Sequence, residues 1–326
     1  MMFANSIGDE MTIPEVLAIL SDATEFDEVP VRHNEDKLNA ELCEHVRMKD
    51  SLELANMELP STKTQLLLQA HFDSIPLPIS DYYTDCKMVM DQAIRVIQAM
   101  VDVSADSGWL ATTLSCMSLI QMIVQAKWHD ASTLTTLPNI DDDKVSAFAQ
   151  FKIECLPELV HFLSTASRRR IGELERRLRA KGLTQGECSK AFSTASSLPL
   201  VNVNWSMETD VLGPDAEGEV NVVLARVNSG SLKVVSPFPK PKSEGHWLVL
   251  GCPEQGELLA LKRVTARRRT ATALTFYTED LDVPDDGYVT LCLYLISDSY
   301  VGLDQEYSIR IRIDAAAESG EDDEAE

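Results

Sequence analysis

The chain has 326 residues, 44% of them hydrophobic, and carries a formal net charge of −23. Such a length is typical of about two domains, and the hydrophobic fraction is ample for globular cores. The acidic excess argues against nucleic-acid binding by the chain as a whole, because affinity for phosphate comes from clustered Lys and Arg.

Targeting and redox signals point to a cytosolic or nuclear protein. No run of 18 apolar residues occurs, so we expect no membrane span. The start, MMFANSIGDEMTIPEVL, lacks a basic region followed by an apolar segment, so we expect no signal peptide. The seven cysteines are scattered without CxxC spacing, which predicts reduced thiols and no metal site built from them.

The negative charge is unevenly distributed along the chain. Residues 1–137 hold 8 Lys and Arg against 21 Asp and Glu, and residues 198–326 hold 11 against 23. Residues 138–197 hold 10 against 8. Any contact with nucleic acid is therefore expected in this middle segment.

Residues 1–137 have a helical period almost throughout. The stretches 84–104 and 109–128 each place their apolar side chains on one stripe, and the short loop Asp106-Ser107-Gly108 separates them. A loop of this length suits antiparallel neighbours. We predict a helical bundle over 1–137.

Residues 138–197 are predicted to be a compact helix-loop-helix unit. Asp141 to Asp143 supply an acidic first turn, which is favourable at a helix N-terminus. The stretch SRRRIGELERRLRAKGL follows, with Gly182 as a helix-ending residue.

From about Leu198 the period changes to two, which is typical of strands. Ile309, Ile311 and Ile313 alternate with arginines, so we expect one face of this strand to be buried and the other to be exposed to solvent. Seven candidate strands occur, at 201–208, 219–227, 246–251, 257–264, 270–278, 287–297 and 307–314. They predict an immunoglobulin-like β-sandwich over 198–315, followed by an acidic, disordered tail at 316–326. The fold class is therefore α+β and multidomain.

Motifs of catalysis are missing from the sequence. There is no GxxxxGK[ST], GxGxxG, HExxH or GxSxG, and the six histidines have no paired ligand spacing. We predict that the chain is not an enzyme by itself and has neither a catalytic nor a metal site.

The predicted order of domains is unusual: a helical bundle, then a small helical unit, then a sandwich. A dozen short motifs occur along the chain in the order known from one family. They include ILSDA (19–23), VRHNED (31–36), LLLQAHF (66–72), IECLPELVH (153–161), PFPKPKSEGHWLVLG (237–251) and SDSYVGLDQEY (297–307). From about Pro14 to Ile313 the chain resembles the SEC-sixty-three homology domain, which follows the helicase cassettes of large RNA helicases. VRHNED and IECLPELVH resemble the activating signal cointegrator complex type more than the spliceosomal type.

The resemblance implies a role for the module within a larger protein. In such helicases ATP binding and strand separation belong to the cassettes, which this sequence lacks, so no cofactor is expected here. The module packs on its cassette, its bundle helps line the exit of the single strand, and it serves as a regulatory and protein-binding platform. The helicases act in splicing, in disassembly of collided ribosomes or in alkylation repair, which implies a location in the nucleus and cytoplasm.

The sequence departs from the family pattern at two places. His246 stands where relatives carry a second aromatic residue before Trp247, and the loop between Ser206 and Glu219 is shortened. These departures affect the surface contacts of the sandwich. We predict that Trp247 belongs to the sandwich core.

The sharpest candidate site is a group of six arginines in the middle segment: Arg168, Arg169, Arg170, Arg176, Arg177 and Arg179. On one helix, Arg169, Arg176 and Arg177 would share a face. They could contact the phosphates of a passing single strand of RNA or DNA, or form a solvated face paired with Glu173 and Glu175.

Two further groups are candidates for an interaction surface. Arg267, Arg268 and Arg269 are interpreted most simply as a hairpin tip that keeps the sheet edge soluble, with a binding role as the alternative. Tyr300 and Asp304 lie in SDSYVGLDQEY, between the last two strands. This stretch is either a structural turn or a docking surface for the helicase cassette or a partner.

Three hypotheses follow from the sequence. The chain is an accessory module of a nucleic-acid helicase, acting on the cassette in cis and on subunits of its complex. Alternatively, it is a free-standing adaptor of the same fold, since it starts with Met1-Met2 and lacks a cassette. A third reading is autonomous single-strand binding by the arginine segment.

Overall fold

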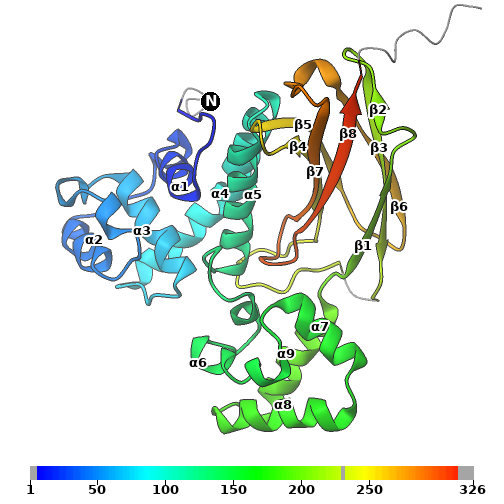
Figure 1. Ribbon diagram of the computed structural model, residues 1–326. Coiled ribbons are helices and arrows are strands. Elements are labelled where there is room, and N and C mark those ends of the chain that lie inside the picture. Colours follow the sequence, from blue (N-terminus) through cyan, green and yellow to red (C-terminus); the bar gives the residue numbers. More distant parts are fainter. Residues whose placement is uncertain (1–5, 229–231, 315–326) are drawn as a thin grey trace, which may run out of the picture.

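The computed structural model describes residues 6–228 and 232–314, with helices up to residue 197 and mainly strands from residue 201 (Figure 1). The helices are α1 Ile13–Ser21, α2 Glu35–Cys43, α3 Pro60–Phe72, α4 Ser80–Asp106, α5 Leu110–Gln125, α6 Asp142–Val145, α7 Leu156–Thr165, α8 Arg168–Ala180 and α9 Gln185–Ser197. The strands are β1 Val201–Ser206, β2 Val211–Leu212, β3 Glu217–Arg226, β4 His246–Cys252, β5 Glu257–Val264, β6 Thr270–Tyr277, β7 Tyr288–Ser297 and β8 Gln305–Ile313. The predicted mixture of helix and sheet is confirmed.

The two long predicted helices are α4 and α5, which lie side by side between the other bundle helices and the sheets (Figure 1). The apolar stripe of α4 is fully buried at Val89, Ala93 and Ile97. Gly108 has a φ of 78°, a conformation that glycine adopts without strain, and lets the chain reverse between the two helices. The same loop reaches the sheet, because Leu258 N–H donates to Gly108 O over 2.7 Å.

The strands form two sheets. The smaller has the order β1-β3-β6 and the larger β2-β8-β7-β4-β5. Apolar side chains from both sheets, such as Val222 of β3, Leu248 of β4 and Ile309 of β8, share one core. Within the ranges that the structure describes there is one more strand than predicted, β2, whose two residues pair in parallel with β8. It lies in the loop that the sequence showed to be shortened.

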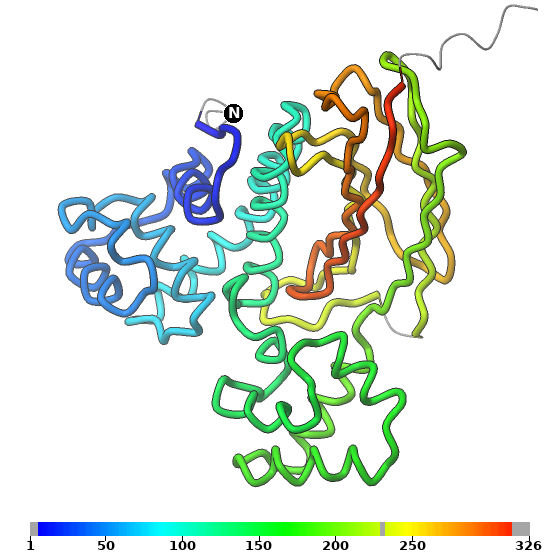
Figure 2. The backbone as a smooth tube through the Cα atoms, in the orientation of Figure 1, coloured from blue at the N-terminus to red at the C-terminus, as the bar shows by residue number. Residues whose placement is uncertain are grey.

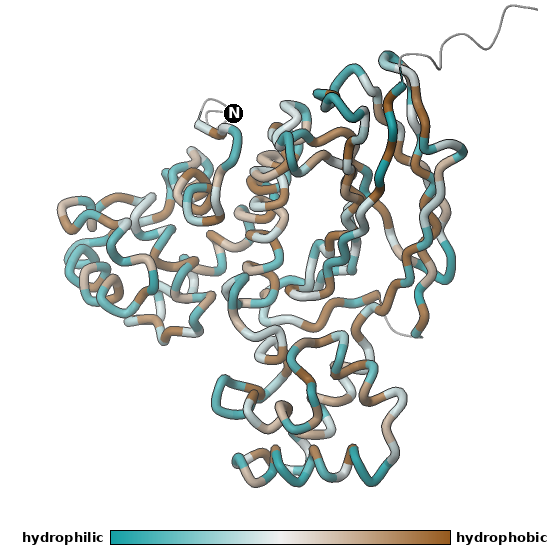
Figure 3. Tube along the Cα trace, in the orientation of Figure 1, coloured by the Kyte–Doolittle hydropathy of each residue, from teal (hydrophilic) through white to brown (hydrophobic). Residues whose placement is uncertain are grey.

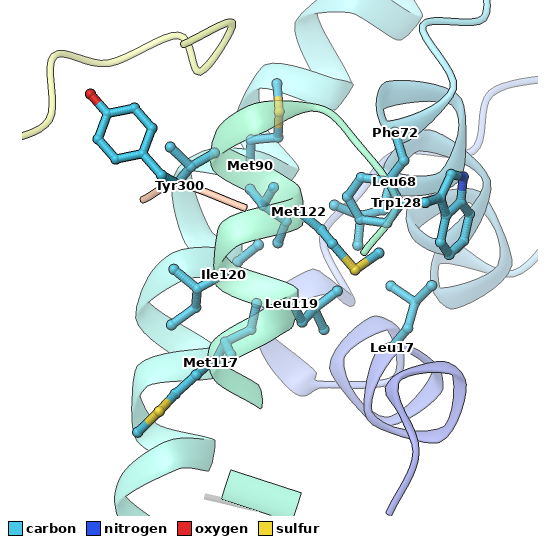
Figure 4. Close-up of a cluster of buried hydrophobic side chains, with 14 of the residues drawn as sticks. Leu17, Leu68, Phe72, Met90, Met117, Leu119, Ile120, Met122, Trp128 and Tyr300 are labelled. Atoms are coloured by element: carbon cyan, nitrogen blue, oxygen red, sulfur yellow. The ribbon is translucent and has the colours of Figure 1, made fainter. Parts of the chain in front are cut away.

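A second hydrophobic core joins the helices to the larger sheet. Figure 4 shows its centre, with Leu17 of α1, Leu68 of α3 and Trp128 on one side of α5 and Tyr300 on the other. The cluster continues to Trp247 and Val249 of β4. β4 thus faces the helices with Trp247 and Val249, and the smaller sheet with Leu248 and Leu250. Burial on both faces explains its continuous apolar run. Trp247 is buried, as predicted, but it lies in the core shared with the helices and not in the core between the two sheets.

The connection between β5 and β6 differs from the prediction. β5 pairs with β4 in the larger sheet, while β6 pairs with β3 in the smaller one. Arg267, Arg268 and Arg269 therefore lie on a connection that crosses from one sheet to the other, and the predicted hairpin tip is wrong. Two successive strands with alternating polarity suggested a hairpin because sequence does not reveal which neighbour each strand pairs with.

The remaining helices lie below the bundle (Figure 1). α8 and α9 are joined by residues 181–184, and Gly182, with a φ of 97°, ends α8 as predicted. α6 and α7 precede them, so the predicted helix-loop-helix has two more helices beside it. Figure 2 shows that residues 232–245 run along the helices before they enter β4. The three domain boundaries stay a prediction, and the predicted tail at 316–326 lies outside the described residues.

Candidate functional site

The predicted arginine helix exists as α8. Leu174 and Leu178, four residues apart, are fully buried, whereas all six arginines of the predicted site are exposed. The hydropathy colouring in Figure 3 shows the same division, with hydrophilic positions between the apolar ones along α8. An amphipathic helix packed by one narrow stripe leaves a wide polar face for other contacts.

Most of this positive charge has no ion-pair partner among the residues that the structure describes. Glu173 is the shared partner of Arg169, at 3.4 Å, and of Arg176, at 3.9 Å. The Arg169 and Arg176 side chains are 88% and 73% exposed, and such exposed ion pairs contribute little. Within residues 6–228 and 232–314, Arg168, Arg177 and Arg179 form no ion pair. Of the two glutamates expected to pair with these arginines, only Glu173 does so in the described part of the chain.

A polar hollow of about 520 Å³ brings three of the six arginines together: Arg170, Arg176 and Arg177. Its opposite wall is Gln150 and Phe151. Arg168, Arg169 and Arg179 lie outside this hollow. The predicted shared face is therefore shifted, since Arg170 takes the place expected for Arg169.

Phe151 is a functional candidate that sequence reasoning missed. It packs edge-on against Phe162 of α7, with ring centroids 5.3 Å apart. The Arg170 guanidinium lies over the Phe162 ring, 5.3 Å from its centroid. An aromatic ring beside several arginines is the combination that stacks a base and holds its phosphate. A Phe in an apolar stretch gives no sign of this, because only the fold brings it next to α8.

The stretch SDSYVGLDQEY is the turn between β7 and β8, and it docks on α5. Gln121 donates to Ser297 O over 2.8 Å and to both Asp304 carboxylate oxygens, at 3.0 and 2.9 Å. Gln125 donates to Ser299 O over 2.6 Å. These contacts hold the turn to the bundle.

Of the two readings left open for this stretch, the burial of Tyr300 fits the structural turn. Tyr300 is 5% exposed, and its hydroxyl accepts from Val235 N–H at 3.4 Å. Burial raises the pKa of Tyr300 to about 12. Asp304 remains exposed, but its carboxylate also accepts from Ser297 N–H at 2.7 Å and so serves the turn itself. The surface reading was open in the sequence because the partners of this turn are distant in the chain: α5 for Ser297 and Ser299, and Val235 for Tyr300.

The other predicted surface, Arg267 to Arg269, is exposed as expected. Its contacts in the described part of the chain are made by the backbone, where Arg267 N–H donates to Thr265 O at 3.0 Å. It lies on a different element from α8, so the structure does not join the two arginine groups into one site.

A buried ionic cluster is the second group that sequence reasoning missed. The ammonium of Lys63, which is fully buried, donates to Glu35 at 2.6 Å, Asp85 at 2.7 Å and Pro30 O at 2.7 Å. Arg32 completes the cluster by pairing with both carboxylates. Burial opposes ionisation of Glu35 and Asp85, but hydrogen bonds from Lys63 and Arg32 outweigh it and lower the pKa of both. VRHNED supplies Arg32 and Glu35, so the motif has a structural role.

The structure gives no support for a cofactor site. Among the described residues, no group of three or more His, Cys, Asp or Glu is arranged to hold a metal ion. The expectation of no bound cofactor stays a prediction. No helix in residues 6–228 and 232–314 is long and apolar enough to cross a membrane.

Comparison with known proteins places the chain among helicase-associated sequences. Residues 1–310 match the family described as the Sec63 Brl domain. The chain is 36% identical to human activating signal cointegrator 1 complex subunit 3 over 98% of its own length, and 35% identical to the Arabidopsis thaliana DExH-box ATP-dependent RNA helicase DExH14 over 94%. It is 30% identical over 96% to the Drosophila melanogaster U5 small nuclear ribonucleoprotein 200 kDa helicase. It spans only 14–16% of the length of these relatives.

Proposed function

Because the chain belongs to the Sec63 Brl domain family, we propose that it is a non-catalytic accessory module of an ATP-dependent nucleic-acid helicase. The observation that carries the proposal is the match of nearly the whole chain to a small part of relatives that are named as helicases. A module of this kind would stabilise its helicase cassette and regulate unwinding. Its partners would be that cassette in cis and the subunits of its complex, in the nucleus and cytoplasm.

The basic face of α8 is the proposed contact with the unwound single strand. Arg170, Arg176 and Arg177 would bind phosphates, and Phe151 would stack on a base. The acidity of the rest of the chain would keep nucleic acid away from other surfaces. Contact would then be confined to the hollow that α8 forms with Phe151.

The two sheets support a finer statement about the fold. If the strands are lettered A, A′, B, C, C′, E, F and G in chain order, the smaller sheet is A-B-E and the larger is A′-G-F-C-C′. The distribution of A, B and E against C, F and G is that of immunoglobulin domains. We therefore propose an immunoglobulin-like unit. A crystal structure in which these strands fail to superpose on such a domain would refute this.

The accessory role can be tested by joining the module to a cassette. Unwinding of a duplex by the helicase cassette of the DExH14 relative is measured with and without this chain fused in cis, together with the thermal stability of the cassette. The proposal expects both to change. If neither the unwinding rate nor the melting temperature moves, the accessory role fails and a free-standing adaptor becomes the better reading.

The α8 contact is tested by binding of fluorescent 20-nucleotide single strands of RNA and DNA at 50 and 200 mM salt. Replacing Arg170, Arg176 and Arg177 by Ala should weaken binding and flatten its salt dependence, because about one released counterion is lost per phosphate contact. The matched control removes the same charge elsewhere, by replacing Arg267, Arg268 and Arg269 by Ala. Equal losses in both variants, or no binding at 50 mM salt, would rule out a specific α8 contact.

A further inference from the structure

A groove of about 560 Å³ opens where several segments meet around the start of α4. It is bounded by the end of α3, the loop before α4, the end of α5 and the segment that precedes β4. Figure 4 shows Met90, one of its lining residues, beside the end of α5. Most of the lining is apolar and comes from Ile75, Leu77, Tyr83, Met90, Pro237 and Pro239. A groove of this size and character accepts large apolar side chains of a ligand.

The walls of the groove are held in place before any ligand binds. Ile75 N–H donates to Ala70 O at 2.8 Å, and Leu77 N–H donates to the Tyr83 hydroxyl at 3.3 Å. An ion pair of 3.1 Å between Lys240 and Asp91 ties the proline-rich segment to α4. Prolines restrict the backbone further. A preformed groove binds with a smaller loss of conformational entropy than a flexible one.

One large aromatic side chain of the lining is in contact with water. Tyr83 is 57% exposed, although its hydroxyl accepts a hydrogen bond from Leu77 N–H. Tyrosines that are fixed at one end and exposed on the ring are frequent anchors at interfaces. An apolar groove with such a rim marks a binding surface more often than a neutral piece of exterior.

The charge of the groove distinguishes it from the rest of the molecule. The chain carries 52 Asp and Glu, yet no residue that lines the groove is acidic. Lys87 lines it, is exposed, and has no ion pair within the described part of the chain. Burial lowers the pKa of His71, so this second basic residue stays neutral. The groove therefore attracts an anionic group, such as a carboxylate.

We propose that this groove binds a short peptide segment of a partner protein, in which large apolar side chains stand next to Asp or Glu. The apolar side chains fill the space between Tyr83 and the two prolines, and the carboxylate pairs with Lys87. The inference rests on the interaction role proposed above and gives it a surface and a partner chemistry. Nucleic acid does not fit the same surface, because Lys87 is the single unpaired cation among its described lining residues.

The test uses the whole chain and no helicase. A phage-displayed library of random 12-residue peptides is panned against the chain, and the enriched peptides are synthesised with a fluorescent label for anisotropy. We expect enriched peptides to combine aromatic or large aliphatic residues with Asp or Glu. Tyr83→Asp should weaken their binding at least tenfold. The matched control is Tyr277→Asp, which alters a tyrosine that is 47% exposed on β6 and should leave binding unchanged.

A charge-reversal variant distinguishes specific binding in the groove from nonspecific hydrophobic binding. Lys87→Glu should weaken binding of the acidic peptides. It should strengthen binding of the same peptides with Lys in place of Asp or Glu. The proposal is overturned if no peptide is enriched, if Tyr83→Asp and Tyr277→Asp act alike, or if sedimentation shows that Tyr83→Asp abolishes a dimer of the chain, since the occupant would then be a second copy. None of these outcomes depends on the unwinding assay, so failure here leaves the accessory role standing.

Discussion

Lys63 is the shared cation of a buried ionic cluster. Its ammonium is fully buried between Glu35 and Asp85, and it lies 4.3 Å from the centre of the Tyr82 ring. The cluster links the start of α2 to α3 and α4. A buried ion pair adds little net stability over an apolar substitute, but removal of one member leaves the others uncompensated.

We therefore expect Lys63→Met to destabilise the chain by about 3–5 kcal/mol. The remaining carboxylates of Glu35 and Asp85 would be buried without their shared cation, and only Arg32 would stay to pair with them. Urea denaturation followed by circular dichroism gives the change in unfolding free energy. The control Lys37→Met removes an exposed lysine from α2 and should stay within about 0.5 kcal/mol. Similar losses in both variants would contradict the cluster's role.

His246 makes stability depend on pH. It is 5% exposed, and burial lowers its pKa to about 4 in the folded chain, against about 6.5 when unfolded. The unfolded chain thus binds a proton first as the pH falls. The contribution of the neutral imidazole to stability is complete above pH 6.5 and is lost progressively down to about pH 4.

His246→Phe, which replaces the imidazole by a ring that does not titrate, should remove this dependence. The unfolding free energy of the variant minus that of the native chain should increase by up to about 3 kcal/mol as the pH falls from 7.5 to 4. The size follows from about 1.4 kcal/mol per pKa unit. Urea denaturation at half-unit pH steps measures the difference. His129→Phe, at an exposed histidine, is the control and should give parallel curves. A constant difference between native chain and His246→Phe would show that His246 does not titrate in this range.

At the scale of elements, α5 and the β7–β8 turn depend on each other. Two glutamines one helical turn apart, Gln121 and Gln125, donate to the backbone carbonyls of Ser297 and Ser299. Gly302 makes the turn fit, since it has a φ of 82° and a Cβ there would lie 2.2 Å from Thr133 Cγ2. The turn is therefore shaped by helices that precede it in the chain.

Replacing Gln121 and Gln125 together by Ala should loosen this turn. The carbonyl groups of Ser297 and Ser299 would lose their donors, so opening of the turn would cost less free energy. Hydrogen exchange read by mass spectrometry should be at least tenfold faster over residues 297–306. Gln98→Ala on α4 is the control and should leave these amides unchanged. Exchange that stays slow in the double variant would mean that other contacts hold the turn.

At the scale of the whole molecule, two hydrophobic cores share strand β4. One lies between the two sheets, and the other connects the larger sheet with the helices. Val249 and Val222 are both fully buried, the first in the core shared with the helices and the second in the core between the sheets. Their positions predict different consequences for the same chemical change.

Val249→Ala and Val222→Ala should each cost about 2 kcal/mol, from two lost methyl groups and the cavity left behind. Only Val249→Ala should speed hydrogen exchange in α5 as well as in β4. Val222→Ala should act on the strands and leave α5 protected. If both variants leave the exchange of α5 unchanged, helices and sheets do not share a cooperative core.

The sequence alone determined the composition of the fold. Periods of 3.6 and 2 separated helices from strands, because each reflects which side chains one element can bury, and the predictions for α4, α5 and β8 were confirmed. Gly108 and Gly182 marked helix ends, since glycine adopts a positive φ without strain. The order of the motifs also indicated the family to which the chain belongs.

Only the tertiary structure decided how these elements meet. Sequence could not show that β5 and β6 belong to different sheets, that Phe151 lies beside Arg176 and Arg177, or that Tyr300 packs into the core formed with the helices. It also could not show that Lys63 is shared by Glu35 and Asp85. The physical reason is the same in each case. Periodicity records the face that a residue turns to the interior, whereas its contacts depend on residues that are distant in the chain and become neighbours only through packing.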